Sequence, residues 1–458
     1  MTIANAIIRV ADLLGERLTT SQAMCDQHGQ NETYYPATPP DAVAFPQTTQ
    51  EISAILKICN EERCPVVPYG AASSLEGQHL CTKGGISLDM ARMASVLRVN
   101  PEDLTATVQP GITRKRLNED LRATGLFFPV DPGADASVGG MAATRASGTT
   151  AVRYGTMREN VLALEAVMAD GTTIRTGSGA RKSSTGYDLT HLLIGSEGTL
   201  GIITELTLRL QGTPEVITAA TCRFPSVEDA VNCVILTIQS GLPMARIELV
   251  DEMMVRGFNA YSGVSLPEEP HLFLEFHGTP DGVAAQAVTF EEIAADFGAK
   301  GWATAQTTEE RNALWAMRHD SHYASAALGK GGHIWPTDVC VPISRLAEAV
   351  LQAQRDAVRL ALTSTIVGHV GDGNFHAGLS VDPQDADEMA RAEKFTTALA
   401  ETALRLGGTV SGEHGIGLGK QKFMAAEHGA ALAYMRAIKA GFDPHNILNP
   451  GKMLPAAN

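Results

Sequence analysis

Two short segments carry the side chains with the clearest catalytic potential, Gly368-His-Val-Gly-Asp-Gly-Asn-Phe-His376 and Ser411-Gly-Glu-His-Gly-Ile-Gly417. His369 and His376 are seven residues apart in the chain. On a straight strand this spacing would place them on opposite faces. The turn-forming residues between them allow the chain to reverse and bring both imidazoles to one point. Two neutral imidazoles and one carboxylate, here Glu413, form a ligand set typical of catalytic metal sites.

Each histidine taken alone is more simply explained as a turn cap or as the partner of a buried carbonyl group. The two segments together favour a metal site with positions left open for a substrate. This ligand set does not identify the metal, because zinc, manganese and iron all accept two histidines and a carboxylate.

Three further segments are rich in glycine and other small residues, and they lie in the first half of the chain. They are Pro68–Gly77, Pro132–Gly148 and Gly195–Gly201. Small residues let consecutive backbone N–H groups approach a phosphate, although one such loop alone also fits a surface turn. No G-x-G-x-x-G opens a strand–helix unit, which disfavours a nicotinamide site.

The three loops together resemble those of the flavoprotein superfamily of vanillyl-alcohol oxidase and p-cresol methylhydroxylase, over residues 36–210. The resemblance implies bound FAD. Tyr69-Gly-Ala-Ala-Ser-Ser74 contains no histidine or cysteine that could link the flavin covalently, so we expect FAD to be non-covalent. Tyr69 stands where many relatives have arginine. The cofactor-binding residues that the resemblance implies are Pro68, Tyr69, Gly70, Ala71, Ser73, Ser74, Gly77, Pro132, Gly133, Ser137, Gly139, Gly140, Ser147, Gly148, Gly155, Glu197, Gly198, Gly201, Ile202, Ile203 and Asn449.

The two histidine segments and the terminal Phe442-Asp-Pro-His-Asn-Ile-Leu-Asn-Pro-Gly-Lys452 narrow the resemblance. They are similar to the FAD-linked D-lactate and D-2-hydroxyglutarate dehydrogenase branch, which includes the glycolate oxidase flavin subunit. The resemblance implies that His369, His376 and Glu413 are metal ligands. It also implies that His414 is the general base and that Asn374 contacts the substrate.

The chemistry of such a site is coherent on general grounds. Transfer of hydride from C2 of a hydroxy acid to flavin N5 requires the C2 hydroxyl group to lose its proton. A divalent metal lowers the pKa of that hydroxyl group, and a histidine accepts the proton. The flavin accepts the electrons.

Arg318 is the candidate for binding the substrate carboxylate, since its planar guanidinium suits bidentate contacts. An arginine on a helix is usually a solvated surface residue, and the resemblance is what favours a functional role. Trp335 and Pro336 stand where diacid-specific relatives need a second cation, which favours D-lactate or a similar small 2-hydroxy monoacid. His322, with His333, could bind a distal group when protonated. The alternatives are a glycolate oxidase flavin subunit, a D-2-hydroxyglutarate dehydrogenase, a metallohydrolase and a flavin- or metal-binding protein without turnover.

Composition restricts the partners and the compartment. The net charge of −15 argues against binding to nucleic acid and to anionic lipid. The seven scattered cysteines and the absence of a signal or spanning segment favour a reduced, cytoplasmic protein. Peripheral contact with the inner membrane through the electron acceptor is the alternative. That acceptor, whether quinone, cytochrome or electron-transfer flavoprotein, stays open, and a homodimer is the expected assembly.

The elements predict an α+β protein of more than one domain, since 458 residues exceed one ordinary core. Hydrophobic periodicity predicts a helix over 48–63 and strands over 86–90 and 105–108. Asp170-Gly171 indicates a hairpin. We expect a p-cresol-methylhydroxylase-type FAD-binding domain of two α/β subdomains over 1–212. A substrate or cap domain with an antiparallel sheet should follow over 213–406, and the segment 407–458 should return to the FAD-binding domain.

Overall fold

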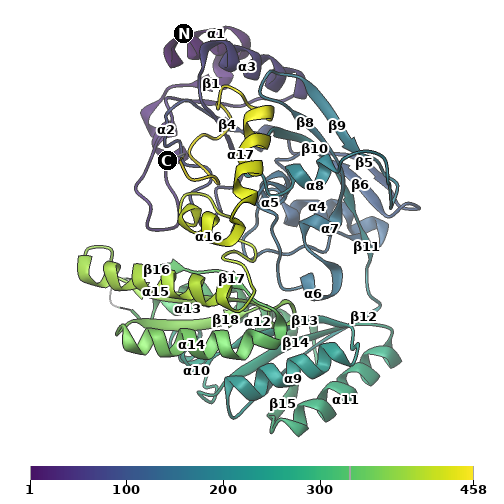
Figure 1. Cartoon of the computed structure of the whole chain (residues 1–458). Coiled ribbons are helices and arrows are strands. Elements are labelled where there is room, and N and C mark those ends of the chain that lie inside the picture. Colours follow the sequence, from purple (N-terminus) through teal and green to yellow (C-terminus); the bar gives the residue numbers. More distant parts are fainter. Residues whose placement is uncertain (1, 330–331, 457–458) are drawn as a thin grey trace. The chain divides into compact units, whose positions relative to one another are not determined.

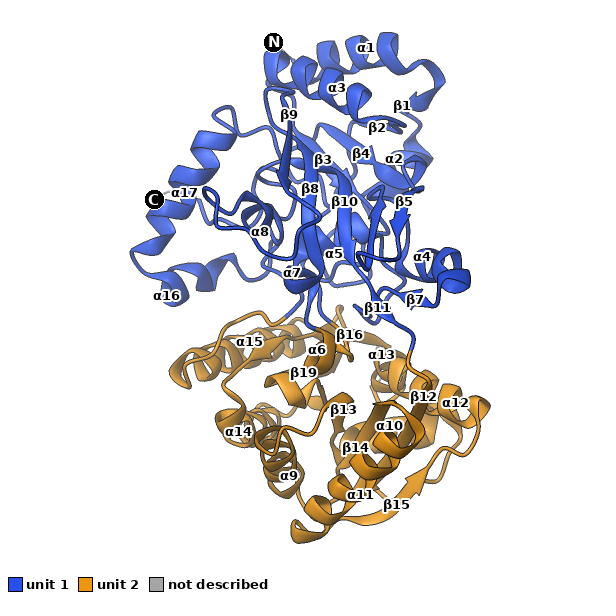
Figure 2. Ribbon diagram, turned by 90° about the vertical axis from the view of Figure 1, so that its right-hand side faces the viewer, with its two compact units in different colours: residues 1–147, 155–213, 413–458 blue, residues 148–154, 214–412 orange. Residues whose placement is uncertain are grey.

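A computed structural model describes residues 2–329 and 332–456, and it divides the chain into two compact units (Figure 2). The first unit holds the chain up to Ser147, then Gly155–Thr213, and then everything from Glu413 onward. The second unit holds Gly148–Tyr154 and Pro214–Gly412. The chain leaves the second unit a few residues later than predicted. The short return of 148–154 to the second unit was not predicted.

The first sheet of unit 1 has the strand order β1-β2-β4-β3 (Figure 1). Its strands are β1 (Leu18–Thr19), β2 (Ala42–Ala44), β3 (Val66–Tyr69) and β4 (Ile86–Asp89), and β4 runs parallel to both β2 and β3. The accompanying helices are α1 (Ile3–Leu14), α2 (Gln22–His28) and α3 (Thr49–Glu62). The helix α3 begins where the Thr48 side chain accepts a hydrogen bond from the Glu51 amide, and it buries Ile52, Ile55 and Leu56.

The second sheet of unit 1 is antiparallel, in the order β5-β6-β10-β8-β9. Its strands are β5 (Val96–Asn100), β6 (Thr105–Val108), β8 (Val161–Val167), β9 (Thr173–Gly177) and β10 (Ile202–Arg209). β8 and β9 form the predicted hairpin, with Gly171 at φ 82°. Around this sheet lie the short pair β7 (Leu126–Phe127) and β11 (Gln211–Gly212) and the helices α4 (Arg114–Leu121), α5 (Val138–Thr144), α7 (Met157–Asn160) and α8 (Leu189–Leu193).

The C-terminal segment of the chain, from Glu413 onward, belongs to unit 1. It contains α16 (Met424–His428) and α17 (Ala431–Phe442). After α17, Leu448 pairs in parallel with Val66 of β3. The Val66 amide donates to the Ile447 carbonyl oxygen at 2.8 Å, and the Asn449 amide donates to the Val66 carbonyl oxygen at 2.9 Å. The tail therefore extends the edge of the first sheet, beside the start of the first small-residue loop.

Unit 2 is built on one antiparallel sheet in the order β15-β12-β14-β13-β18-β19-β16, with β17 also paired to β19. The strands are β12 (Val216–Arg223), β13 (Met244–Val250), β14 (His271–Gly278), β15 (Lys300–Thr304), β16 (His333–Pro336), β17 (Val339–Cys340), β18 (Thr363–Gly368) and β19 (Asn374–Val381). The helices are α6 (Ala151–Tyr154), α9 (Val227–Gln239), α10 (Glu252–Ser262), α11 (Pro280–Asp296), α12 (Thr308–His319), α13 (Ser321–Ala326), α14 (Leu346–Arg359) and α15 (Ala386–Arg405).

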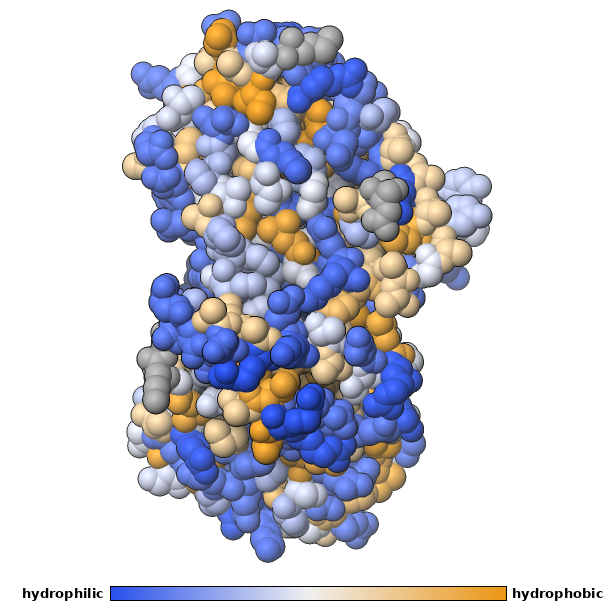
Figure 3. Space-filling view, turned by 60° about the vertical axis from the view of Figure 1, so that its left-hand side comes forward, coloured by the Kyte–Doolittle hydropathy of each residue, from blue (hydrophilic) through white to orange (hydrophobic). Residues whose placement is uncertain are grey.

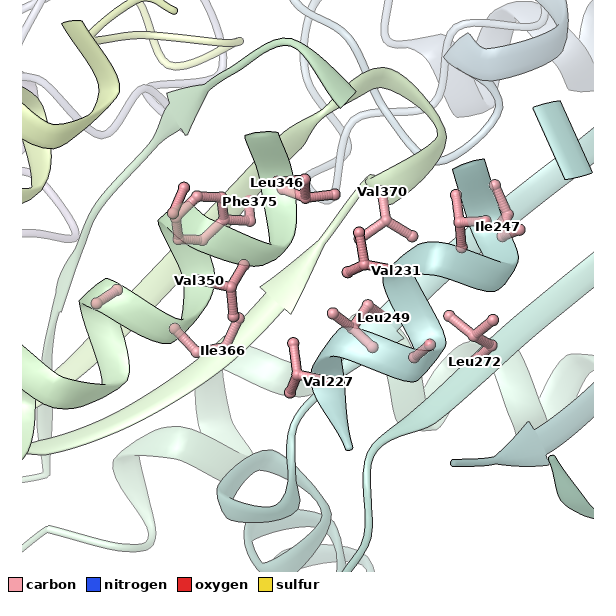
Figure 4. Packing of buried hydrophobic residues seen from close by; sticks show 14 of the residues in the cluster. Val227, Val231, Ile247, Leu249, Leu272, Leu346, Val350, Ile366, Val370 and Phe375 are labelled. Carbon is pink, nitrogen blue, oxygen red and sulfur yellow. The ribbon is translucent and has the colours of Figure 1, made fainter. Parts of the chain in front are cut away.

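The two faces of this sheet differ in chemistry. One face packs against α9, α11, α14 and α15 in a large apolar core. Figure 4 shows Val231 of α9 and Val350 of α14 against strand residues that include Leu249 and Ile366. Because side chains alternate along a strand, Arg246 and Glu248 of β13 point to the other face. A smaller apolar cluster from β13, β14, α10, α12 and α13 lies on that second face.

None of the described helices is both long enough and apolar enough to span a bilayer. On the face drawn in Figure 3, hydrophilic and hydrophobic side chains are interspersed over each unit. All seven cysteines are free thiols, and six of them are buried.

Candidate active site

The three small-residue loops of unit 1 converge. The Gly195 and Glu197 amides of the third loop donate to the Ala142 and Ala143 carbonyl oxygens of α5, each at 2.8 Å. A Cβ atom at Gly70 of the first loop would lie 2.2 Å from the Ser137 hydroxyl oxygen of the second loop. A Cβ atom at Gly198 would lie 2.4 Å from Cγ of Pro68. Loops predicted from separate parts of the chain therefore form one backbone-lined cradle.

This cradle fits the phosphates of FAD. Only residues without side chains allow the backbones to approach so closely. Ala72, Glu197 and Gly198 adopt left-handed backbone conformations with φ of 56°, 53° and 69°. Turns of this kind direct successive N–H groups to one side, which suits an anionic group.

The other predicted cofactor residues fall into two groups. Tyr69, Ala71, Ser73, Gly77, Pro132, Gly133, Gly139, Gly140, Ser147 and Gly201 lie in or beside the same loops, Gly155 begins the next stretch of unit 1, and Gly148 falls in unit 2. Ile202 and Ile203 are instead core residues of β10, with 1% and 8% of their surfaces exposed, so only their backbone remains available to a cofactor.

Ser74 and Asn449 hold the loops in place. Nε2 of His79 lies 2.8 Å from the Gln30 carbonyl oxygen and therefore carries the proton, so Nδ1 accepts from the Ser74 hydroxyl at 3.1 Å. The Asn449 side chain donates to the Gln78 and Glu197 carbonyl oxygens at 2.9 and 2.7 Å.

Replacement of Gly198 by alanine is expected to lower the FAD content and the unfolding temperature. The new methyl group would meet Pro68, and the left-handed backbone adds a cost of about 1–2 kcal/mol. The matched control is Gly125→Ala, because Gly125 has φ of 70° and no atom within 4 Å of its Cβ position. Flavin absorbance per protein and thermal unfolding check the pair. Equal flavin content in both variants would show that the cradle does not depend on this contact.

The two histidines of unit 2 come together through a hairpin, as the sequence predicts. His369 follows β18, a single 3-10 turn covers Val370–Asp372, and His376 lies in β19. Gly373 closes the turn at φ 78°, where a Cβ atom would lie 2.1 Å from the Val341 carbonyl oxygen. The imidazole centroids are 5.4 Å apart.

Hydrogen bonds set which nitrogen of each ring carries the proton. Nδ1 of His376 lies 3.1 Å from the Thr337 carbonyl oxygen, which can only accept a hydrogen bond. Nδ1 of His369 lies 2.7 Å from the Glu248 carboxylate. Both Nδ1 atoms therefore carry the proton, and both Nε2 atoms present a lone pair, as metal-binding histidines require.

Glu413 directly follows the last residue of unit 2 and completes the ligand set. His369, His376 and Glu413 each offer one ligand atom, and these three atoms lie within 4.8 Å of one another. Two imidazole nitrogens and one carboxylate at this spacing fit a divalent transition metal such as zinc, manganese or iron.

The segment after Glu413 is held in unit 1 by two buried side chains. The Glu197 carboxylate accepts from the Ile416 and Gly417 amides at 2.6 and 2.9 Å. Burial raises the pKa of this carboxyl group, and those two amides oppose the rise. The Gln78 amide donates to the His414 carbonyl oxygen at 2.7 Å. Gln78, directly after the first loop, and Glu197 of the third loop thus fix the backbone that carries His414.

Arg318 is buried on α12, with 7% of its surface exposed. Nη2 donates to Oε2 of Glu248 at 2.5 Å, and Nη1 donates to the Ser321 hydroxyl oxygen at 3.4 Å. Its buried Nε has no hydrogen-bond partner among the described residues. A buried donor without an acceptor is costly, so this N–H suits an anionic ligand. Arg318 is therefore a core residue of the second sheet face and not a solvated one.

Asn374 is held by a second buried carboxylate. Its Nδ2 donates to Oδ1 of Asp338 at 2.7 Å and to the Val339 carbonyl oxygen at 2.8 Å. Oδ2 of Asp338 accepts from the Ser411 hydroxyl at 2.8 Å. Oδ1 of Asn374 is buried and has no hydrogen-bond partner in the described part of the chain, so it can accept from a ligand hydroxyl group.

The structure does not bring Trp335 and His322 to this site. Trp335 pairs with Leu379 and packs against the large apolar core, on the opposite sheet face from His376. The strand register instead turns Ile334 and Pro336 to the His376 side, opposite Ser380 and Gly378. His322 is exposed on α13, with its ring edge-on to Tyr323.

Sequence reasoning missed Glu248, Asp338 and Gln78. Glu248 had a usable signal, because Arg246 and Glu248 are charged residues in the otherwise apolar strand Met244-Ala-Arg-Ile-Glu-Leu-Val250. Asp338 lies in Thr337-Asp-Val-Cys-Val-Pro342, but its partners Asn374 and Ser411 are distant in the chain. Gln78 directly follows the first loop and carries no pattern that marks a role.

Comparison with solved structures agrees with this geometry. The chain aligns with p-cresol methylhydroxylase with substrate bound at a TM-score of 0.80 and 18% identity, over 98% of this chain and 96% of the other. The chain thus has a p-cresol-methylhydroxylase-type α+β fold, as predicted. Residues 40–177 match the family model described as an FAD binding domain, and residues 213–453 match that of the C-terminal domain of FAD linked oxidases.

Three curated relatives span most of the chain. A probable mitochondrial D-lactate dehydrogenase of Danio rerio is 48% identical over 96% of this chain and 89% of its own length. The mitochondrial D-lactate dehydrogenase [cytochrome] of Arabidopsis thaliana is 44% identical over 98% and 80%. The glycolate oxidase subunit GlcD of Bacillus subtilis is 37% identical over 92% and 91%. The chain belongs to the FAD linked oxidase family and is an FAD-dependent oxidoreductase.

Proposed function

We propose that this chain is a metal-dependent D-2-hydroxy-acid dehydrogenase that oxidises D-lactate, or a similar small monocarboxylic acid, to the 2-oxo acid. The observation that carries the proposal is the ligand set of His369, His376 and Glu413 within 4.8 Å. Both imidazoles already have their Nδ1 protons bound by acceptors. The names of the Danio and Arabidopsis relatives support D-lactate as the substrate.

In this proposal, different residues of the chain bind the substrate and accept its proton. Arg318 offers its buried Nε–H to the substrate carboxylate, and Asn374 offers Oδ1 to a substrate hydroxyl group. A metal held by the three ligands would lower the pKa of the C2 hydroxyl group. His414 then accepts that proton as general base. FAD, when bound, accepts the hydride from C2 at its N5 atom.

The side pocket is small in this proposal, for a different reason from the one predicted. Ile334 and Pro336, rather than Trp335, supply apolar surface on the His376 side. Neither offers a cation for a second carboxylate, so a monoacid is favoured over D-2-hydroxyglutarate.

The names of the relatives bear on the electron acceptor and on the compartment. The name of the Arabidopsis relative favours a cytochrome as acceptor. The predicted cytoplasmic location stays a prediction beside two relatives that are named mitochondrial, and so does the homodimer.

Anaerobic addition of D-lactate to the purified yellow holoprotein tests the proposal. We expect the flavin absorbance to bleach, with little bleaching by L-lactate. Treatment with a chelator should abolish the bleaching, and Mn²⁺ or Zn²⁺ should restore it. Bleaching that survives complete metal removal would contradict the metal role.

Substrate choice is measured on the same protein. The value of kcat/KM should be higher for D-lactate and D-2-hydroxybutyrate than for D-2-hydroxyglutarate. A preference for the diacid would overturn the monoacid assignment. A preference for glycolate would favour the second candidate, a glycolate-oxidising flavin subunit, which the Bacillus relative supports.

A further inference from the structure

Glu248 connects the candidate metal site to the candidate substrate site. It lies in β13, where 1% of its surface is exposed. Oε1 accepts from Nδ1 of His369 at 2.7 Å, and Oε2 accepts from Nη2 of Arg318 at 2.5 Å. Each carboxylate oxygen therefore serves one functional side chain, and those two side chains come from different elements, α12 and the end of β18.

The charge at this position has a clear physical reason. A buried carboxylate is strongly unfavourable unless a cation and hydrogen bonds compensate it. Arg318 supplies the cation, and the neutral His369 supplies the second hydrogen bond. Glu248 in turn keeps the proton of His369 on Nδ1 and the guanidinium of Arg318 in one orientation.

We propose that Glu248 is a positioning residue that sets the metal-binding tautomer of His369 and the orientation of Arg318 at the same time. The inference rests on the proposed function, because it assigns Glu248 to that same site. It predicts that one substitution weakens both metal binding and substrate binding, although Glu248 itself is neither a metal ligand nor a candidate substrate contact.

Glu248→Gln tests this assignment because glutamine cannot serve both partners. If its amide oxygen faces His369, its amide N–H₂ opposes the donor Nη2 of Arg318. If its oxygen faces Arg318, its N–H₂ points at Nδ1 of His369 and favours the tautomer whose Nε2 carries a proton. That tautomer has no lone pair for a metal at Nε2.

Glu275→Gln is the matched control. Glu275 lies on the neighbouring strand β14, is also 1% exposed, and accepts from Nε2 of His277 at 2.7 Å and from Nη1 of Arg246 at 3.5 Å. The two substitutions thus remove the same charge from the same sheet face. Only Glu248 contacts a predicted metal ligand.

The readouts are the Mn²⁺ dissociation constant of the FAD-loaded protein, from competition with a chelator, and KM for D-lactate. In Glu248→Gln we expect Mn²⁺ to bind about 10–100-fold more weakly, with a raised KM and unchanged FAD content. In Glu275→Gln both values should stay within about threefold of wild type, because Glu275 does not contact a predicted metal ligand. Glu248→Asp keeps the charge and should bind Mn²⁺ more tightly than Glu248→Gln.

Three results would overturn the inference. The first is wild-type Mn²⁺ affinity in Glu248→Gln. The second is an equal loss in Glu275→Gln, which would indicate a general effect of removing a buried charge. The third applies if Glu248→Gln does not fold: wild-type Mn²⁺ affinity and KM in Glu248→Asp, whose shorter side chain cannot keep both contacts. If the wild-type protein itself binds no metal, the proposed function fails instead, so the two failures are distinguishable.

Discussion

Replacement of His376 by alanine is expected to slow the reduction of flavin by D-lactate by about 10³-fold or more, because loss of the proposed metal would remove several kcal/mol of stabilisation from the transition state. His376 supplies one of only two imidazoles in the ligand set, and its Nδ1 is already held by Thr337. Alanine leaves no donor atom at that position. The FAD cradle lies in unit 1, so the flavin content should not change.

The metal content of the purified variant measures the loss of the metal, and anaerobic stopped-flow absorbance measures the rate of flavin reduction. His191→Ala is the control for histidine removal, since His191 lies in unit 1 and bonds to Asp188 and to the Arg158 carbonyl oxygen. Loss of FAD together with the metal would indicate a damaged fold. Full activity without bound metal would show that these residues form a site with another purpose.

The elements themselves were largely predictable, because their signals are local. The strand over 105–108 and the hairpin at Asp170-Gly171 were confirmed, and so was the helix at 48–63 to within its end residues. Alternation along β13 and the turn residues between His369 and His376 also act over a few positions. Patterns that extend over only a few residues can be recognised in a single sequence.

The partners across the sheet were not predictable in the same way. Glu248 reaches His369 only because β13 pairs with β18, where Leu249 lies opposite Gly368. Strand order is set by the packing of the whole unit, and no local pattern encodes it. The placement of Trp335 depends on pairing in a related way: the register of β16 on β19 decides which of Ile334, Trp335 and Pro336 faces the histidines. A shift of one residue would have exchanged the two faces.

Replacement of His414 by alanine is expected to lower the rate of flavin reduction by about 10²–10⁴-fold, the usual contribution of a general base. This variant should keep its metal, in contrast to His376→Ala, because Glu413 and both imidazole ligands remain. The loop should also keep its place. Gln78 holds the backbone oxygen of residue 414, and Glu197 holds the next amides along the chain, so the side chain of His414 is not needed for either contact.

Added imidazole distinguishes a general base from a purely structural residue, because it would not raise the rate of flavin reduction if His414 had only a structural role. A free imidazole can occupy the space of the missing ring and accept the C2 hydroxyl proton, so it should restore part of the rate in His414→Ala in proportion to its concentration. It should restore nothing in Arg318→Ala, where the missing group is the one proposed to bind the substrate carboxylate. Reduction at the wild-type rate without any imidazole would remove His414 from the mechanism. A base would then have to be sought among the other groups near Asn374.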